Sequence, residues 1–393
     1  MQIILARLWL LVFAAAWLAI SCWGSAHAIL SKRDPRSALS WTGLIWLVPY
    51  LGALLYLLFG INRVERRALR LRAGTPRYRA SGPEGTATVR LLGAELPPNA
   101  VQLAVLVRRV TKRPLVAGNR VSVLENGDEA YPAMLAAIDA AAESVWLLSY
   151  IFDDSSVGRT FIEALGRARE RGLQVRVLID DAGSIDTDAD RLLRDRGVIV
   201  ERFLPVRFSW RASHFNLRNH RKLLVVDGKI GFTGGMNIHV GHVLAGKPEW
   251  PVRDVHFRVD GGVVAHLREA FAEDWEFTTG EALDTEAELE RGSVGSVVAR
   301  GVVDGPDERM GPVHLTLVGA LACATRSVRI VTPYFLPDQA IILALRVAGL
   351  RGVQIDIVLP ERSDVRIVDF AARAQLAQVI GPGVRVWYGA LPF

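Results

Sequence analysis

The chain has 393 residues, of which 50% are hydrophobic and 22% are charged. This composition excludes a disordered protein, a collagen and a coiled-coil rod, and the length suffices for a membrane anchor and two modest domains. With 47 Lys+Arg against 41 Asp+Glu, the net charge of +6 favours an anionic partner, either a membrane surface or nucleic acid. The two cysteines, Cys22 and Cys323, do not suffice for a disulfide framework or a zinc site.

Two apolar runs near the N-terminus predict a membrane anchor. The first begins at residue 8 and stays largely apolar up to Lys32, and the second covers residues 39–61 without a charge. Each approaches the ~20 residues that cross a bilayer as a helix. We therefore expect residues 1–61 to form a two-helix transmembrane hairpin.

The basic residues after the second run predict its orientation. This segment contains only one acidic residue, Glu65. Its basic residues are Arg63, Arg66, Arg67, Arg70, Arg72, Arg77 and Arg79. By the positive-inside rule, the chain after residue 61 lies in the cytoplasm, where these arginines could also bind anionic head groups. An alternative is a cleaved signal peptide, because residues 26–28 fit a cleavage site and Arg7 supplies a charged start, but the second run favours an anchor.

The rest of the chain predicts a duplicated α/β protein. Residues 62–125 are expected to be a connector with strand-like pieces such as residues 101–107. Helical and strand patterns then alternate twice. The first set is helix 131–144, strand 145–152, helix 158–171, strand 175–179, helix 189–196 and strand 198–203. The second set is helix 314–326, strand 328–334, helix 339–350, strand 353–359, helix 367–379 and strand 384–388. Such alternation indicates a buried parallel or mixed sheet.

The two sets also match in sequence. Residues 172–178 resemble residues 352–358, and residues 197–200 resemble residues 383–386. A repeat of this length is a duplicated domain rather than a solenoid unit. We expect a first domain over residues 126–290 and a second over residues 291–393.

One motif carries chemistry. Residues 219–228 read NHRKLLVVDG and residues 233–237 read TGGMN, so His220, Lys222 and Asp227 form the pattern H-x-K-x-x-x-x-D. On a strand, His220 and Lys222 would share one face. A histidine and a lysine on an otherwise apolar strand need an anionic partner or a function. Asp227 either orients the site or closes the strand into the following turn.

These residue types suit a phosphodiester. A neutral imidazole at His220 is a competent nucleophile, and Lys222 can neutralise a phosphoryl oxygen. Asn237 can donate a hydrogen bond to the same phosphate, and Gly235 lets the backbone approach it. Asp254 is our candidate for holding the other ring nitrogen of the histidine. This chemistry requires no metal and no cofactor.

The motif resembles the HKD signature of the phospholipase D superfamily. Other stretches are similar to bacterial cardiolipin synthases, namely residues 49–56, 150–154, 181–184, 218–222, 271–281 and 332–335. The resemblance runs in order along nearly the whole chain. It implies an N-terminal membrane hairpin followed by duplicated phospholipase D-like α/β domains, in a multi-pass protein of the bacterial inner membrane.

The resemblance also implies a reaction. One phosphatidylglycerol gives its phosphatidyl group to a histidine, glycerol leaves, and a second phosphatidylglycerol accepts the group to form cardiolipin. Exchanging one phosphodiester for another is nearly isoenergetic, so no nucleotide is needed. The partners would be phosphatidylglycerol and anionic membrane lipid rather than nucleic acid, with homo-oligomerisation left open. The alternatives are a hydrolytic phospholipase D or phosphodiesterase, or an inactive protein that binds anionic lipid.

In one respect the chain departs from the family. The family carries two HKD motifs, one in each duplicated domain, whereas residues 386–393 are the stretch that precedes the second motif. We therefore expect a second domain truncated before its HKD motif, which puts the activity of this chain in question.

Overall fold

The computed structural model describes residues 2–32, 35–48, 50–61, 97–205, 218–285, 293–305, 311–363, 365–390 and 392–393. The chain divides into two compact units, residues 1–70 and residues 71–393. The arginines at positions 63–79, most of the expected connector and the expected boundary at residue 290 lie outside the described residues.

The N-terminal unit is helical. It contains α1 (Gln2–Ser31), α2 (Pro35–Leu47), α3 (Leu51–Leu55) and the π-helical turn η1 (Tyr56–Gly60). Among the described residues, one helix is long and apolar enough to cross a membrane, the segment Arg7–Ser31 of α1. The expectation of a second continuous spanning helix is therefore not met. The second apolar run is divided between Leu47, where α2 ends, and Leu51, where α3 begins, and Tyr50 takes a positive φ of 61°.

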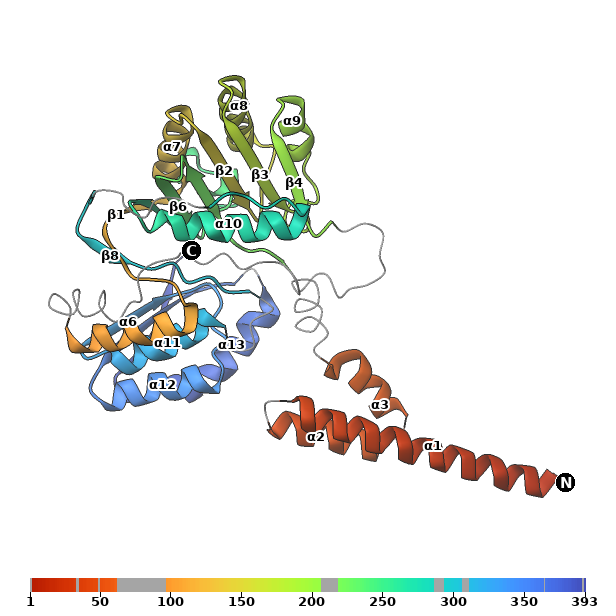
Figure 1. Ribbon diagram of the computed structural model, residues 1–393. Helices are drawn as coiled ribbons and strands as arrows, with labels where there is room; N and C mark the ends of the chain where they lie inside the picture. The colour runs from red at the N-terminus through yellow and green to blue at the C-terminus, as the bar shows by residue number, and fades with distance from the viewer. Residues whose placement is uncertain are drawn as a thin grey trace. The chain divides into compact units, whose positions relative to one another are not determined.

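The divided second run packs against α1 (Figure 1). The Trp46 indole Nε1 donates to the Ser25 hydroxyl at 2.9 Å, and Ala28, Ile45 and Tyr56 form a small buried cluster. Most large side chains of α1 are exposed, for example Leu10 at 70%. A helix that is apolar all round and uncovered by protein is typical of a lipid-facing segment.

The first half of the C-terminal unit is built on an eight-stranded mixed sheet in the order β4-β3-β2-β5-β6-β7-β1-β8. The strands β2, β3 and β4 are parallel, and the remaining pairs are antiparallel. The strands are β1 (Val116–Glu125), β2 (Ser144–Ser149), β3 (Gln174–Asp180), β4 (Ile199–Phe203), β5 (Leu223–Val226), β6 (Ile230–Gly234), β7 (Val255–Asp260) and β8 (Val297–Ala299).

Helices cover both faces of this sheet (Figure 1). One face carries α7 (Asn126–Asp139), α8 (Ser156–Glu170) and α9 (Ala189–Asp195), and the other carries α10 (Val264–Thr279). Successive residues of β2 alternate between the two cores: Leu147 packs with the α8 side, and Trp146 and Leu148 pack with the α10 side. Since both faces of the central strands are buried, they read as continuous apolar runs in the sequence.

The second half has a three-stranded parallel sheet in the order β11-β10-β9. Its strands are β9 (Ser327–Val331), β10 (Gln354–Pro360) and β11 (Val384–Gly389), and its helices are α11 (Pro312–Cys323), α12 (Gln339–Leu350) and α13 (Arg366–Val379). The order β9-α12-β10-α13-β11 repeats the order β2-α8-β3-α9-β4 of the first half. The helices and strands of both sets lie within a few residues of their predicted positions.

The expected connector needs two corrections. Residues 101–107, expected as strand-like, belong to the helix α6 (Pro98–Thr111), and β1 pairs with β7 inside the first sheet. The β-branched residues suggested a strand, but tertiary packing outweighs propensity here. The helix α6 packs on α11, where the Leu106 side chain lies against Gly319 and would have to shift to admit a larger residue there.

Candidate active site

His220 and Lys222 lie immediately before β5, not on a strand as expected. Two buried carboxylates hold this segment instead of a strand partner. Asp180, at the end of β3, accepts the Asn219 backbone N–H at 2.9 Å. Asp274, from α10, accepts the Asn219 amide group at 2.6 Å and also binds the Arg221 guanidinium. Because both carboxylates are at most 1% exposed, the bonds are shielded from water and fix the loop firmly.

An aromatic ring positions the histidine. The Tyr150 ring stacks on the His220 imidazole, with centroids 4.0 Å apart and planes 19° apart. The Lys222 ammonium lies 5.2 Å from the centroid of the same ring and donates to the His220 carbonyl oxygen at 2.7 Å. A cation over an aromatic face is attracted by the ring quadrupole. Tyr150 thus contacts both motif residues, a role that the sequence analysis did not predict for it.

The imidazole of His220 is suited to attack. Partial burial lowers the pKa of His220 below its usual value, the charge on Lys222 lowers it further, and Asp180 opposes both effects. The ring is therefore neutral at pH 7. Its nitrogens make no hydrogen bond to any residue that the structure describes, and the residue is exposed on one side. A neutral, accessible imidazole can use a ring nitrogen as a nucleophile.

Burial also changes the lysine. It lowers the pKa of Lys222 to about 8, against the opposing influence of Asp254 and Asp180. The ammonium form still predominates at pH 7, but it is poorly solvated. An incompletely solvated cation interacts more strongly with an incoming anion than a surface lysine does.

Asp254 does not hold the histidine ring as expected. Its carboxylate accepts the Val255 backbone N–H at 2.7 Å, and within the described part of the chain it makes no hydrogen bond to His220. Its charge instead acts on Lys222, and burial raises the pKa of the Asp254 carboxyl. Any side chain at Gly235 would clash with this carboxylate, which gives a physical reason for glycine there.

Asn237 is anchored by hydrogen bonds at both its side chain and its backbone. Its side-chain oxygen accepts the Ile151 backbone N–H at 3.0 Å, and its carbonyl oxygen accepts from the Tyr131 hydroxyl at 2.7 Å. With the oxygen engaged, the amide N–H groups are what the side chain can offer a phosphate.

Asp227 lies at the far end of β5 from the histidine. Its carboxylate accepts the backbone N–H groups of Ala142, Glu143 and Ser144 at 2.8–3.0 Å, which ties the β5–β6 turn to the start of β2. The residue has a positive φ of 50°, which aspartate tolerates better than most residues. Of the two roles left open, these contacts favour closure of the strand.

We expect Asp227→Ala to act on stability rather than on chemistry. Three charge-assisted hydrogen bonds disappear and a left-handed backbone becomes harder to hold, so the free energy of unfolding should fall by about 2 kcal/mol or more. Thermal unfolding in detergent measures this, with Asp139→Ala as an exposed control. A rate per folded molecule that falls as far as in a His220 variant would instead place Asp227 in the reacting site.

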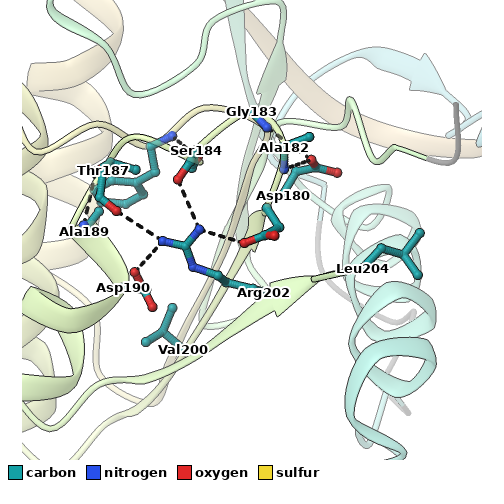
Figure 2. A network of polar contacts seen from close by, with 12 residues as sticks. Asp180, Ala182, Gly183, Ser184, Thr187, Ala189, Asp190, Val200, Arg202 and Leu204 are labelled. Atoms are coloured by element: carbon teal, nitrogen blue, oxygen red, sulfur yellow. Dashed lines mark hydrogen bonds and ion pairs between the residues drawn. The ribbon is translucent and has the colours of Figure 1, made fainter. Parts of the chain in front are cut away.

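A second network supports Tyr150. Figure 2 shows the Arg202 guanidinium surrounded by Ser184, Thr187 and Asp190. It donates to the Ser184 carbonyl at 3.1 Å and to Asp190 at 2.6 Å, which fixes the loop after β3. From this loop the Ser184 hydroxyl donates to the Tyr150 carbonyl oxygen at 3.2 Å. The backbone that carries the stacked ring is therefore held by a chain of polar contacts.

Replacing Tyr150 should separate stacking from chemistry. In Tyr150→Ala the imidazole loses its platform, so kcat should fall by roughly tenfold or more, whereas Tyr150→Phe keeps the ring and should stay near the parent rate. The pH profile of both variants checks the cause, because removing the ring exposes His220 and should move its pKa up toward the usual value. Equal activity of the alanine and phenylalanine variants would show that the stack does not matter.

Three further histidines lie in this region: the charge of Lys222 acts on His242 and His256, and the His239 ring lies edge-on to that of His242. His242 and His256 are buried, and burial lowers the pKa of each to about 4, so both are neutral. His239 is half-exposed, with its Nε2 atom 3.7 Å from the Asp153 carboxylate. Among the described residues, no group of three or more histidine, cysteine or acidic side chains is placed to hold a metal ion.

Comparison with known proteins identifies the family. A family model described as "Cardiolipin synthase, PLD-like domain" matches residues 134–275 and 317–391, and a model described as "Phospholipase_D-nuclease N-terminal" matches residues 10–60. The cardiolipin synthase of Geobacillus thermodenitrificans is 32% identical over 373 residues, covering 91% of this chain and 72% of that protein. Cardiolipin synthase A of Pseudomonas putida (strain GB-1) is 33% identical over 377 residues, covering 92% and 76%.

A solved structure supports the fold. The phosphatidylserine synthase of Haemophilus influenzae superposes with a TM-score of 0.50 at 14% identity, over 73% of this chain and 77% of that one. At this identity the likeness concerns the fold alone. Two matched segments of the PLD-like domain model, a matched N-terminal model and extended similarity to curated relatives lead to one conclusion: the chain belongs to the cardiolipin synthase family with phospholipase D-like domains.

Proposed function

We propose that the protein forms cardiolipin from two molecules of phosphatidylglycerol by phosphatidyl transfer through His220. Family membership supports the reaction class, and the local geometry supports the nucleophile. The observation that carries the assignment is the pairing of an accessible neutral imidazole with a partly buried ammonium on one aromatic ring.

The reaction has two steps. A ring nitrogen of His220 attacks the phosphorus of the first phosphatidylglycerol, the P–O bond to the glycerol head group breaks, and glycerol leaves after taking up a proton. A hydroxyl of the second phosphatidylglycerol then attacks the phosphohistidine, loses its proton, and the P–N bond breaks. Cardiolipin is released and the imidazole is restored.

Lys222 and Asn237 serve the phosphoryl oxygens in both steps. The charge on these oxygens shifts as the phosphorus passes through its transition state, and a poorly solvated ammonium can follow it. The Asn237 amide offers hydrogen-bond donors to the same group. Gly235 keeps a side chain out of the space beside Asp254, whose carboxylate tunes Lys222.

Product analysis tests the proposal. The full chain is incubated in vesicles with phosphatidylglycerol labelled in its head-group glycerol and, separately, in its acyl chains. Transfer predicts labelled cardiolipin and one released glycerol per cardiolipin formed. Phosphatidic acid without cardiolipin would assign the hydrolytic alternative, and binding to vesicles without any product would assign the lipid-binding alternative.

The finer topology is part of the same proposal. We place the protein in the bacterial inner membrane as a multi-pass protein, with α1 as one span and α2–η1 completing a hairpin, and with the catalytic domains in the cytoplasm. The basic residues that follow residue 61 support this orientation. We propose two phospholipase D-like domains that divide after β8, slightly later than the expected boundary at residue 290, because β8 pairs with β1 in the first sheet. Accessibility of cysteines introduced at residues 34 and 80 to an impermeant reagent in intact cells tests the sidedness.

A further inference from the structure

The helical layer of the second half has an unusual composition. The three adjoining helices α6, α11 and α12 contain no aspartate or glutamate, and their formal charges are Arg108, Arg109 and Arg346. The helix α11 packs against both α6 and α12 (Figure 1). Many outward positions carry large apolar side chains, and the exposed polar ones among them are neutral or basic, such as Gln102, Arg109 and Arg346. The exposed apolar ones outside the helix contacts are Val105, Val313, Leu317, Leu343, Val347 and Leu350, which we call the apolar face.

The helices α11 and α12 are fixed side by side. At one end, His314 pairs with Asp338, the N-cap of α12, at 2.8 Å. At the other end, the Arg351 guanidinium donates to the Ala322 and Ala324 carbonyl oxygens at the end of α11. The inner sides of both helices contribute to the core, through Leu321 and Leu345. The apolar face is therefore the outer side of a fixed layer.

The duplicated fold provides an internal comparison. In the first half, Arg171 donates to the Ile138 carbonyl at the end of α7, as Arg351 does at the end of α11, so α8 corresponds to α12. The outer positions of α8 are polar and include Glu163, Arg167 and Glu170. At the matching places α12 has Leu343, Val347 and Leu350, which are 63%, 45% and 70% exposed. The outer surface of the corresponding helix is thus polar in the first half and apolar in the second.

We propose that the apolar face of α6, α11 and α12 rests on the surface of an anionic phospholipid membrane. Leucine and valine side chains spaced along α12 can enter the head-group region, while Arg346 and Arg109 pair with lipid phosphates at its rim. The absence of acidic residues in the three helices fits a negatively charged surface.

Lipid quenching tests the contact without requiring turnover. In the full chain with Cys22→Ser and Cys323→Ala, an environment-sensitive dye is attached at Leu343→Cys, and the matched control carries it at Glu163→Cys. In vesicles that contain phosphatidylglycerol, emission from position 343 should shift to the blue and be quenched by brominated lipid, and emission from position 163 should not. Equal, unquenched emission at both positions would overturn the inference, and so would a blue shift that appears in detergent with protein concentration, which marks a second copy.

Substituting the outer residues of α8 into α12 provides the second test. Its rate measurement rests on the proposed function. The variant Leu343→Glu, Val347→Arg, Leu350→Glu copies the outer residues of α8. It should lower the transfer rate on phosphatidylglycerol in vesicles by about tenfold and leave the rate on a short-chain, water-soluble phosphodiester unchanged. Equal losses on both substrates would contradict a membrane contact. If the parent chain turns over neither substrate, the proposed function fails, while the quenching result still decides the contact.

Discussion

His220→Ala is expected to abolish phosphatidyl transfer. The imidazole is the group that forms the covalent intermediate, and losing a nucleophile typically costs a factor of roughly 10³ or more. A phosphodiester with a 4-nitrophenyl leaving group provides the sharpest assay, because this group departs without being protonated. The rate of the first step then reports on His220 and its neighbours alone. We expect a phosphorylated histidine, labile to acid, in the parent chain and none in the variant.

A matched histidine controls for general damage. His314 pairs with Asp338 between α11 and α12 and is outside the loop that carries the motif, so His314→Ala should keep the covalent labelling of the parent. Labelling that persists in His220→Ala, or that disappears equally in His314→Ala, would remove His220 from its role. The pH dependence adds a check: because burial lowers the pKa of His220, the rate should hold at pH values where an ordinary histidine is already protonated.

The elements of the fold could be predicted because their signals are local. Each strand of the two repeated sets is a short apolar run between helical patterns, and the predicted helix over residues 339–350 matches α12. The failures lie where distant groups decide the conformation. Residues 98–111 are rich in branched apolar residues yet form α6, because the helix packs on α11, about 200 residues later in the chain.

The same reason limits the prediction of the site. The pattern of His220 and Lys222 is visible in the sequence, but the carboxylates that prevent their segment from forming a strand come from Asp180 and Asp274. Neither of these is near the motif in the chain. Asp227 occupies the aspartate position of the H-x-K-x-x-x-x-D pattern. Its hydrogen bonds, however, hold the end of β5 that lies away from His220. Regular spacing in a motif therefore does not show that all its members meet at the reacting group.

The contacts of Tyr150 and the surroundings of Lys222 depend on the fold and could not be predicted from the sequence. The tyrosine lies 70 residues before the histidine and becomes its stacking partner because β2 and β5 are neighbours in the sheet. The same ring, together with the buried surroundings, removes water from the ammonium group of Lys222. Burial in the fold lowers the pKa of this lysine from its usual value to about 8.

The second large effect on the reaction rate is expected from replacing Lys222, whose pKa the fold lowers. In Lys222→Met the positive charge beside the phosphoryl oxygens is lost, and the rate of the first step should fall by about 10²–10³. Lys222→Arg should also be poor, since the planar guanidinium is wider and cannot occupy the place of a compact ammonium. Lys229→Met, at an exposed lysine paired with Glu143, serves as the matched control and should keep the parent rate.

The pH dependence of this lysine should separate activity from stability. Activity needs the charged form, so the rate of the parent chain should fall as pH rises through about 8. Stability should change in the opposite direction. The pKa is lower in the folded chain than the ~10.4 of an unfolded lysine, so between these values the unfolded chain binds more protons and the free energy of unfolding rises with pH. Lys222→Met has no such group and should lose that rise, whereas Lys229→Met should keep it. Parallel rate and denaturation measurements from pH 7 upward test both trends, and a rate that stays constant well above pH 8 would show that the ammonium charge is not what the reaction uses.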